Sequence, residues 1–236
     1  MKDGITYFGN LDNINSNLNI TYKEENNEKE EDNSIDFNIP VKHCDKYGRF
    51  FKIQYIPKLN EYIIKDLHKG FGTFIKIQES MFLRHKSLIN IGDSYLVFLF
   101  KDNETDINNK DIIYGQNCNL NIKLYEKSDN KDVNINKEFN YNTEYKNNIK
   151  IGRKNHGNDI ELNDNLSSKI NCVIRYENNK GWIIKDGYEI IKKNGEIERN
   201  FSKNGTWFLA KDNIKIIDKM IFKSNFNVFK CNFIKE

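Results

Sequence analysis

Short apolar runs recur along the chain, and polar or turn-forming residues separate them. Apolar and polar side chains alternate in 51–55 and 74–77, which is the period of a strand with one buried face. Helical periodicity is scarce, β-branched and aromatic residues are common, and Ala occurs once, at Ala210. We expect strands over 50–56, 62–64, 73–77, 88–91, 95–100, 149–151, 172–176, 182–184, 206–209, 214–217 and 227–233. The pattern therefore predicts an all-β protein built as sandwiches or barrels.

Polar stretches interrupt this pattern. Residues 23–36 carry seven acidic and two basic side chains, which predicts a disordered acidic insertion. Residues 101–110 and 126–148 are polar and rich in Asn. The second of these falls in the middle of the chain, and we expect a linker or a loop over 127–148.

The chain contains an internal repeat. Residues 61–66 (EYIIKD) match 181–186 (GWIIKD), and 72–74 (GTF) match 205–207 (GTW). The second copy holds about 13 additional residues between its two motifs, within 187–203. Two sandwiches of one fold are the simplest interpretation, with domain boundaries at 1–126 and 149–236.

Length and charge exclude several classes of protein. The 236 residues suffice for one large or two small domains. A net charge of +3 argues against a simple basic nucleic-acid binder. No apolar run reaches the roughly 18–20 residues of a membrane span, and Met1–Gly4 does not begin a secretory signal. We therefore expect no contact with nucleic acid or membrane.

The four Cys residues are far apart and form no Cys-x-x-Cys pair. Reduced thiols in a cytoplasmic or nuclear protein fit this spacing best. His43 and Cys44 are adjacent, but no second pair of ligands has the spacing of a zinc site. We expect no metal and no cofactor, and we expect Cys172, Cys231, Trp182 and Trp207 to be core residues.

Three motifs follow one another in the second half. Gly152-Arg153 ends an apolar run, 158–162 leads into Leu166-Ser167-Ser168-Lys169-Ile170-Asn171, and 202–207 reads Ser-Lys-Asn-Gly-Thr-Trp. They provide a guanidinium at a strand end, a hydroxyl pair beside an ammonium, and an amide before a Gly. Since all three fall in turns between strands, loops at one end of a sandwich could bring them together.

This arrangement resembles the forkhead-associated (FHA) domain over 149–236. The family pattern runs Gly-Arg, Ser-x-x-His, a Trp-x-Ile-x-Asp strand and Asn-Gly, and Asn171 stands here in place of the His. The resemblance implies two FHA-like (SMAD/FHA) β-sandwiches in tandem. It also implies recognition of phosphothreonine in partner proteins. Phosphopeptide contacts are expected at Arg153, Ser168, Lys169, Lys203 and Asn204, with structural support from Gly152, Asn171 and Gly205.

The first copy resembles the later strands of such a domain over about 47–100. Phe71 stands where the family has Asn, Pro40 stands where the phosphate-binding hydroxyl is expected, and Gly48-Arg49 comes too late in the order to be the family's Gly-Arg. We therefore expect a degenerate unit that does not bind phosphate.

No kinase, P-loop or nucleophile–base signature occurs in the chain, so we expect no enzymatic activity. The main alternative is a structural scaffold that holds protein partners without phosphate. An adaptor subunit of a larger enzyme is a third possibility. The sequence leaves the oligomeric state open.

Overall fold

The computed structural model describes residues 4–10, 35–39, 48–101, 119–126, 135–178 and 180–234. All regular secondary structure in these ranges is β-strand, which confirms the all-β prediction. The predicted acidic insertion up to residue 34 lies outside the described residues, as do Pro40, His43, Cys44 and Cys118. Within the ranges given, no helix is long and apolar enough to cross a membrane.

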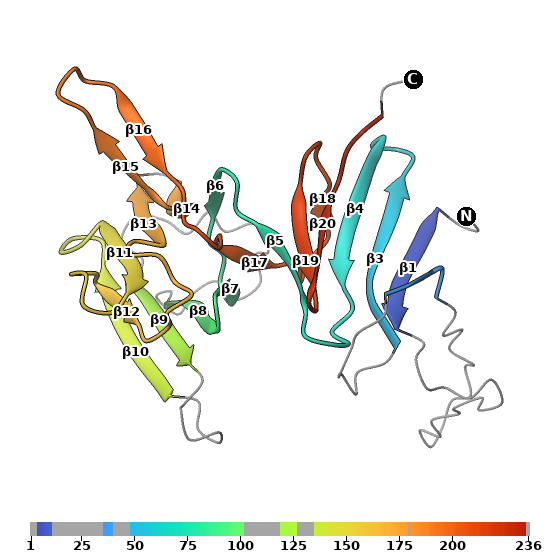
Figure 1. Ribbon diagram of the computed structural model, residues 1–236, viewed down its shortest axis with the longest axis horizontal. Coiled ribbons are helices and arrows are strands. Elements are labelled where there is room, and N and C mark those ends of the chain that lie inside the picture. The colour runs from blue at the N-terminus through green and yellow to red at the C-terminus, as the bar shows by residue number, and fades with distance from the viewer. Residues whose placement is uncertain are drawn as a thin grey trace. The chain divides into compact units, whose positions relative to one another are not determined.

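The chain divides into two compact units, and most of their strands are labelled in Figure 1. Unit 1 comprises Met1–Ile75 together with Ala210–Glu236. Unit 2 is the continuous segment Lys76–Leu209. The two ends of the chain therefore belong to the same unit, although they lie far apart in the sequence.

Unit 1 is a sandwich of two sheets. The strands of unit 1 are β1 (Ile5–Asn10), β2 (Phe37–Asn38), β3 (Gly48–Ile56), β4 (Glu61–Asp66), β5 (Thr73–Lys76), β18 (Ile214–Lys215), β19 (Ile221–Ser224) and β20 (Asn227–Lys230). One sheet has the order β18-β4-β3-β1-β2, and β5, β19 and β20 pair in the other. Phe51 of β3 meets Phe222 of β19 and Phe229 of β20 edge-on, with centroids 5.3 and 5.9 Å apart. Aromatic side chains from both sheets thus meet in this core.

Unit 2 is a second sandwich with one additional hairpin. Its strands are β6 (Ser80–Phe82), β7 (Ser87–Ile91), β8 (Ser94–Lys101), β9 (Asn119–Glu126), β10 (Ile135–Asn142), β11 (Asn148–Arg153), β12 (Ile160–Leu162), β13 (Cys172–Glu177), β14 (Gly181–Asp186), β15 (Tyr188–Ile191), β16 (Ile197–Asn200) and β17 (Trp207–Leu209). One sheet contains β10-β9-β8-β7-β17, the other has the order β12-β11-β13-β14-β6, and β15 pairs only with β16. The core includes Leu96 and Ile122 from the first sheet and Ile151 and Trp182 from the second.

Alternation places the core of this sandwich. In β11, Ile149 and Ile151 are fully buried, whereas Asn148 and Lys150 are exposed. Successive side chains of a strand point to opposite faces, so this pattern turns one face inward. Cys172, Trp182 and Trp207 are buried as predicted, while Cys231 is only half-buried. Burial raises the pKa of the Cys172 thiol, which keeps it protonated.

The compact units do not coincide with the domains 1–126 and 149–236 expected from the repeat. Each copy of the repeat contributes its last strands to the unit built by the other copy. In unit 2, β14 pairs with β6 through Ile184 and Met81, and β17 pairs with β7 through Phe208 and Ile89. In unit 1, the equivalent strands β4 and β5 pair with β18 and β19.

The registers of these pairings are equivalent in the two units. Ile64 of the first copy pairs with Ile214 of the second. Ile184, which holds the place of Ile64 in the second copy, pairs with Met81 of the first. The two copies of the repeat have equivalent strand edges, so a strand from either copy can pair with each edge. The sequence pattern alone therefore could not show which copy provides the pairing strand. This is the physical reason that the expected boundaries differ from the observed units.

The expected linker or loop over 127–148 also differs from the structure. Residues 135–142 form β10, which pairs with β9 along its whole length, from Ile135 opposite Glu126 to Asn142 opposite Asn119. Phe139 and Tyr141 pack against the core on one face. Asn and charged residues between them hid this alternation in the sequence. Residues 127–134 lie outside the described ranges.

Candidate functional site

Three loops of unit 2 carry the motifs found in the sequence. We name them loop A (154–159, after β11), loop B (163–171, between β12 and β13) and loop C (201–206, between β16 and β17). Together with Arg153 at the end of β11 they form what we call the three-loop site. The hydrogen bonds below show that the three loops lie against one another.

Loops A and B are joined at the backbone. The Arg153 amide donates to the Ser168 carbonyl at 2.9 Å. The Asn158 side-chain amide donates to the carbonyls of Arg153 and Lys169, at 3.0 and 2.7 Å. A side chain at Gly152 would place its Cβ 2.3 Å from the Lys169 carbonyl oxygen, so only Gly permits this approach. Gly152 thus sets the distance between the guanidinium-bearing strand and the hydroxyl-bearing loop.

Loops B and C meet at Ser168. The Lys203 amide donates to the Ser168 hydroxyl oxygen at 2.8 Å. The Asn204 side-chain amide donates to the Leu166 carbonyl at 2.7 Å. The Ser168 hydroxyl is already an acceptor here, so its own proton is available to donate to a ligand oxygen. Asn204 retains its side-chain oxygen and a second N–H for a ligand.

A buried polar network lies beneath these loops. Asn171, which is fully buried, accepts a hydrogen bond from the Ser168 amide at 3.2 Å and donates to the Thr206 hydroxyl at 3.0 Å. Asp186 of β14 accepts from the hydroxyls of Ser202 and Thr206, both at 2.6 Å, and from the Ser202 amide at 3.2 Å. A buried network with satisfied partners holds its members rigidly. It fixes loops B and C to the same strand end.

Loop B is also held from its other side. The Asp164 carboxylate accepts hydrogen bonds from the amides of Leu166 and Asp93, each at 2.7 Å. The buried Glu126 at the end of β9 accepts from the Asn163 amide, also at 2.7 Å. Asp93 and Glu126 belong to the first expected domain, 1–126. The loop that presents Ser168 is therefore positioned in part by residues outside the second repeat.

Loop C depends on its Gly and Trp. Gly205 has φ +82°, a conformation that L side chains rarely adopt. The Trp207 indole N–H donates to the Asn204 carbonyl at 2.8 Å, which closes the turn. The Asn-Gly pair thus forms a tight turn that projects Lys203 and Asn204 outward, where both are exposed.

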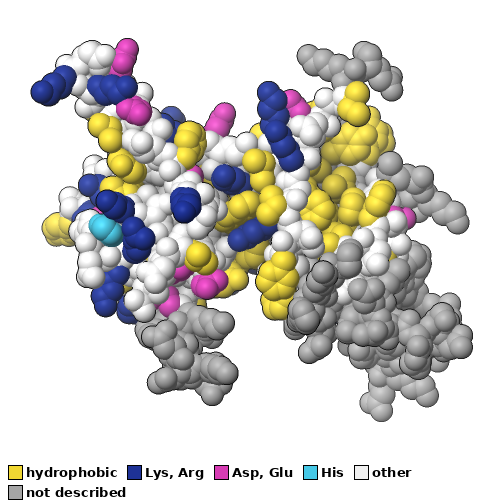
Figure 2. All heavy atoms as spheres, viewed as in Figure 1, with side chains coloured by type: hydrophobic (Ala, Val, Ile, Leu, Met, Phe, Trp, Pro, Cys, Tyr) yellow, Lys and Arg dark blue, Asp and Glu magenta, His cyan; other side chains and the backbone are white. Residues whose placement is uncertain are grey.

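The three-loop site carries basic side chains in addition to the Ser168 hydroxyl. Arg153 is half-buried, and Lys169 and Lys203 are exposed. None of these three side chains has an ion pair or side-chain hydrogen bond within the described part of the chain. Figure 2 shows Lys and Arg side chains gathered over β11 and β12, beside loops A and B. Unpaired cations in one site with a hydroxyl donor are suited to bind an anion.

All the residues predicted for phosphopeptide contact lie on the three-loop site, as do Asn171 and Gly205 of the predicted supporting residues, whereas Gly152 lies in β11 next to Arg153. Sequence reasoning gave no role to Asn158, Asp164, Asp186 and Thr206, which connect the loops. Asn158, Asp186 and Thr206 stand in or beside the motifs, so the sequence indicated that they lie near the site. It did not indicate which hydrogen bonds they make. Among the described residues, no group of three His, Cys, Asp or Glu side chains could hold a metal ion.

Unit 1 has no equivalent arrangement at the corresponding described residues. Phe71, in the place of Asn204, is half exposed, and its amide donates to the Asn225 side chain at 2.8 Å. The Arg49 guanidinium lies 3.7 Å from the centre of the Tyr7 ring, a cation–π contact. That the first copy of the repeat, 1–126, does not bind phosphate stays a prediction.

Comparison with known proteins supports this arrangement. The family model of the FHA domain matches residues 149–226. The match extends beyond Leu209, so it includes β18 and β19, whose pairing partners are strands of unit 1. No curated protein and no solved structure matches the chain significantly. FHA domains are protein-interaction modules that bind phosphopeptides, and residues 149–226 of this chain belong to the FHA domain family.

Proposed function

We propose that the three-loop site binds phosphothreonine in a partner protein, and that the chain serves as a signalling adaptor without catalysis of its own. The observation that carries this proposal is the Ser168 hydroxyl, which accepts from the Lys203 amide and keeps its proton for a ligand. Arg153, Lys169 and Lys203 belong to the same site, and none of them has an ion pair among the described residues. A phosphate ester offers about two negative charges and three acceptor oxygens, which matches this set.

Each residue has a distinct role in this proposal. The Ser168 hydroxyl donates to a phosphate oxygen, and the Arg153 guanidinium supplies a fork of donors to phosphate or to a neighbouring peptide carbonyl. Lys169 and Lys203 add compact positive charge at the rim. Asn204 bonds to the peptide main chain and fixes its direction. The preference for threonine over serine rests on the resemblance to the FHA family.

The expected affinity follows from these contacts. Three charge-assisted hydrogen bonds at about 1.5–3 kcal/mol each give roughly 5–9 kcal/mol. Association and peptide ordering offset part of this, and contacts to the peptide main chain add to it. We expect dissociation constants in the micromolar range, which correspond to a binding free energy of about −8 kcal/mol.

Calorimetric titration of the full chain with phosphothreonine peptides tests the proposed function. We use a pool with degenerate flanking residues, together with matched phosphoserine and unphosphorylated pools. Saturable binding of the phosphothreonine pool is expected, with weaker phosphoserine binding and none for the third pool. Equal binding of the unphosphorylated pool would contradict phosphate-dependent binding and favour the scaffold alternative.

Replacement Arg153→Ala tests the site assignment. We expect at least a tenfold loss of phosphopeptide affinity, about 1.4 kcal/mol, because the guanidinium donors are removed. The chain should remain folded, since this side chain makes no hydrogen bond or ion pair within the described residues. Arg84→Ala is the matched control, because Arg84 is exposed in unit 2 and lies outside all three loops. An unchanged isotherm for Arg153→Ala would contradict the assigned site.

A further inference from the structure

A groove of about 390 Å³ opens on the outer face of the sheet that carries the three-loop site. Val173 and Arg175 of β13 and Ile183 and Lys185 of β14 line its floor, and they alternate with side chains buried in the core. The hairpin β15–β16 forms its wall. Figure 1 shows this hairpin projecting from the body of unit 2.

The hairpin comes from the insertion that distinguishes the second repeat from the first. Ile191 and Ile197 are paired across its two strands, and both line the groove. They are nevertheless 75% and 68% exposed. Ile190, the neighbour on the opposite face, does not line the groove. The insertion thus builds an open apolar wall that nothing in the described part of unit 2 covers.

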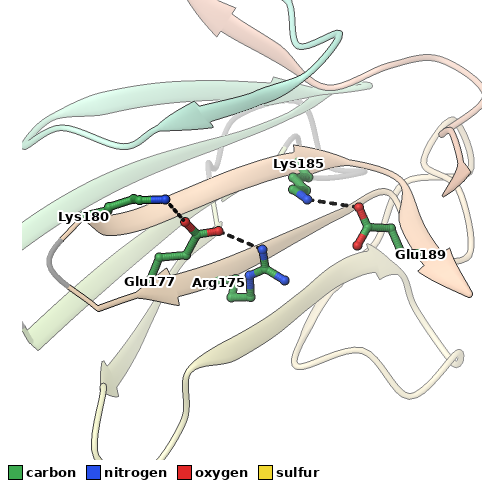
Figure 3. Close-up of polar contacts among 5 residues, drawn as sticks. All are labelled: Arg175, Glu177, Lys180, Lys185 and Glu189. Carbon is green, nitrogen blue, oxygen red and sulfur yellow. Dashed lines mark hydrogen bonds and ion pairs between the residues drawn. The ribbon is translucent and has the colours of Figure 1, made fainter. Parts of the chain in front are cut away.

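The charged side chains of the groove are mainly basic. Lys150, Arg175, Lys185 and Arg199 line it, against Glu189 and the buried Asp186, whose carboxylate is used by Ser202 and Thr206. Figure 3 shows the ion pairs at its floor, Arg175 with Glu177 at 2.7 Å and Lys185 with Glu189 at 3.0 Å.

These ion pairs leave an excess of positive charge. Hydrogen bonds from Arg175 and then Lys180 lower the pKa of Glu177, and a hydrogen bond from Lys185 lowers the pKa of Glu189, so both carboxylates are ionised. Exposed pairs of this kind contribute little to stability and exchange readily. Lys150 has no side-chain partner within the described residues, so carboxylates of a ligand are favoured here.

The groove and the three-loop site share a residue of loop B. Ile170 lines the groove and directly follows Lys169, which we assign to the phosphate. Arg199 of β16 also lines it, and β16 leads into loop C. The Arg199 guanidinium donates to the Asp186 carbonyl at 3.3 Å, so the groove wall is tied to the residue that anchors loop C. A peptide held at Ser168 therefore has one end within reach of the groove.

We infer that this groove binds a second segment of the same phosphorylated partner, an extended stretch that combines apolar side chains with Asp or Glu. The apolar side chains cover Ile191 and Ile197, and the carboxylates face Lys150, Arg175 and Lys185. This inference rests on the proposed function, since the phosphothreonine anchors the peptide beside the groove. It assigns to the inserted hairpin the choice among phosphorylated partners.

Fluorescence anisotropy with the full chain tests this inference. The probes are a short phosphothreonine peptide and two longer versions that add Leu-Glu-Ile-Asp-Leu before or after it. Matched peptides carry Ser-Gly-Ser-Gly-Ser in the same places. We expect one of the acidic, apolar extensions to bind about tenfold more tightly than its Ser-Gly counterpart, which is about 1.4 kcal/mol.

Variant Ile191→Glu should remove this advantage and leave the affinity for the short peptide unchanged, and Ile197→Glu should act in the same way. Ile190→Glu adds the same charge to the opposite face and should keep the advantage. If the short peptide binds but neither extension improves its affinity, or Ile190→Glu and Ile191→Glu behave alike, the groove is not the second site. If the short peptide itself fails to bind, the proposed function falls and this inference falls with it.

Discussion

A fragment of residues 76–209 is expected to fold and to bind the phosphothreonine peptide, whereas a fragment of 149–236 is expected to do neither. The first contains all of unit 2, including the three-loop site. The second lacks everything before residue 149, which supplies ten of the 18 buried residues in the core cluster, among them Leu96, Phe98, Ile122 and Leu124. Burying each such side chain is worth about 1.5–3 kcal/mol. Their loss exceeds the roughly 5–15 kcal/mol that separates a folded from an unfolded domain.

Amide dispersion in NMR spectra and calorimetry with the phosphopeptide pool measure both outcomes. Mixing the fragments 1–126 and 149–236 provides a control, because together they contain every described strand except β10. The mixture should regain dispersed spectra and peptide affinity that neither fragment has alone. A folded 149–236 fragment that binds as tightly as the full chain would show that the strands of the first copy are not needed for the site. It would then support the boundaries expected from the repeat.

Much of the fold could be predicted from alternation alone. Every predicted run overlaps an observed strand. Nine observed strands fall outside the predicted runs, namely β1, β2, β6, β9, β10, β12, β15, β16 and β19. Of these, β2, β6 and β12 are too short to show a period, β15 and β16 pair only with each other, and β9 and β10 lie among Asn-rich residues. In β9, Leu120, Ile122 and Leu124 do alternate, but the polar residues around them obscured the pattern.

The residues of the site could be predicted from the sequence, but the hydrogen bonds that hold its loops in place could not. The order of Gly152-Arg153, Ser168 and Asn204 along the chain carries the resemblance, and these residues do lie on neighbouring loops. The bonds that hold the loops join residues such as Asp93 and Asp164, which are 71 positions apart. Such contacts depend on strand pairing. Because the two copies of the repeat offer equivalent edges, the sequence could not indicate that β7 and β8 of the first copy would support loop B of the second.

Removing the Asp186 carboxylate is expected to affect stability and binding together. This side chain is almost fully buried and accepts three hydrogen bonds, from the Ser202 amide and from the hydroxyls of Ser202 and Thr206. Asp186→Ala leaves these donors without an acceptor in a site closed to water. Buried unsatisfied groups cost about 1–3 kcal/mol each, and rotation of the hydroxyls recovers part of this. We expect the free energy of unfolding to fall by roughly 2–5 kcal/mol.

Phosphopeptide affinity should fall at least tenfold in the same variant, because loop C would no longer hold Lys203 against Ser168. Chemical denaturation gives the stability, and calorimetry at a temperature where the variant is still folded gives the affinity. Asp212→Ala is the control, since Asp212 is exposed and should change neither quantity. Asp186→Asn keeps one acceptor oxygen, so its stability and affinity should lie between those of Asp186→Ala and Asp212→Ala. Full affinity in a folded Asp186→Ala variant would show that Ser168 and Lys203 hold their places without the buried network, and the positioning role assigned to Asp186 would then be wrong.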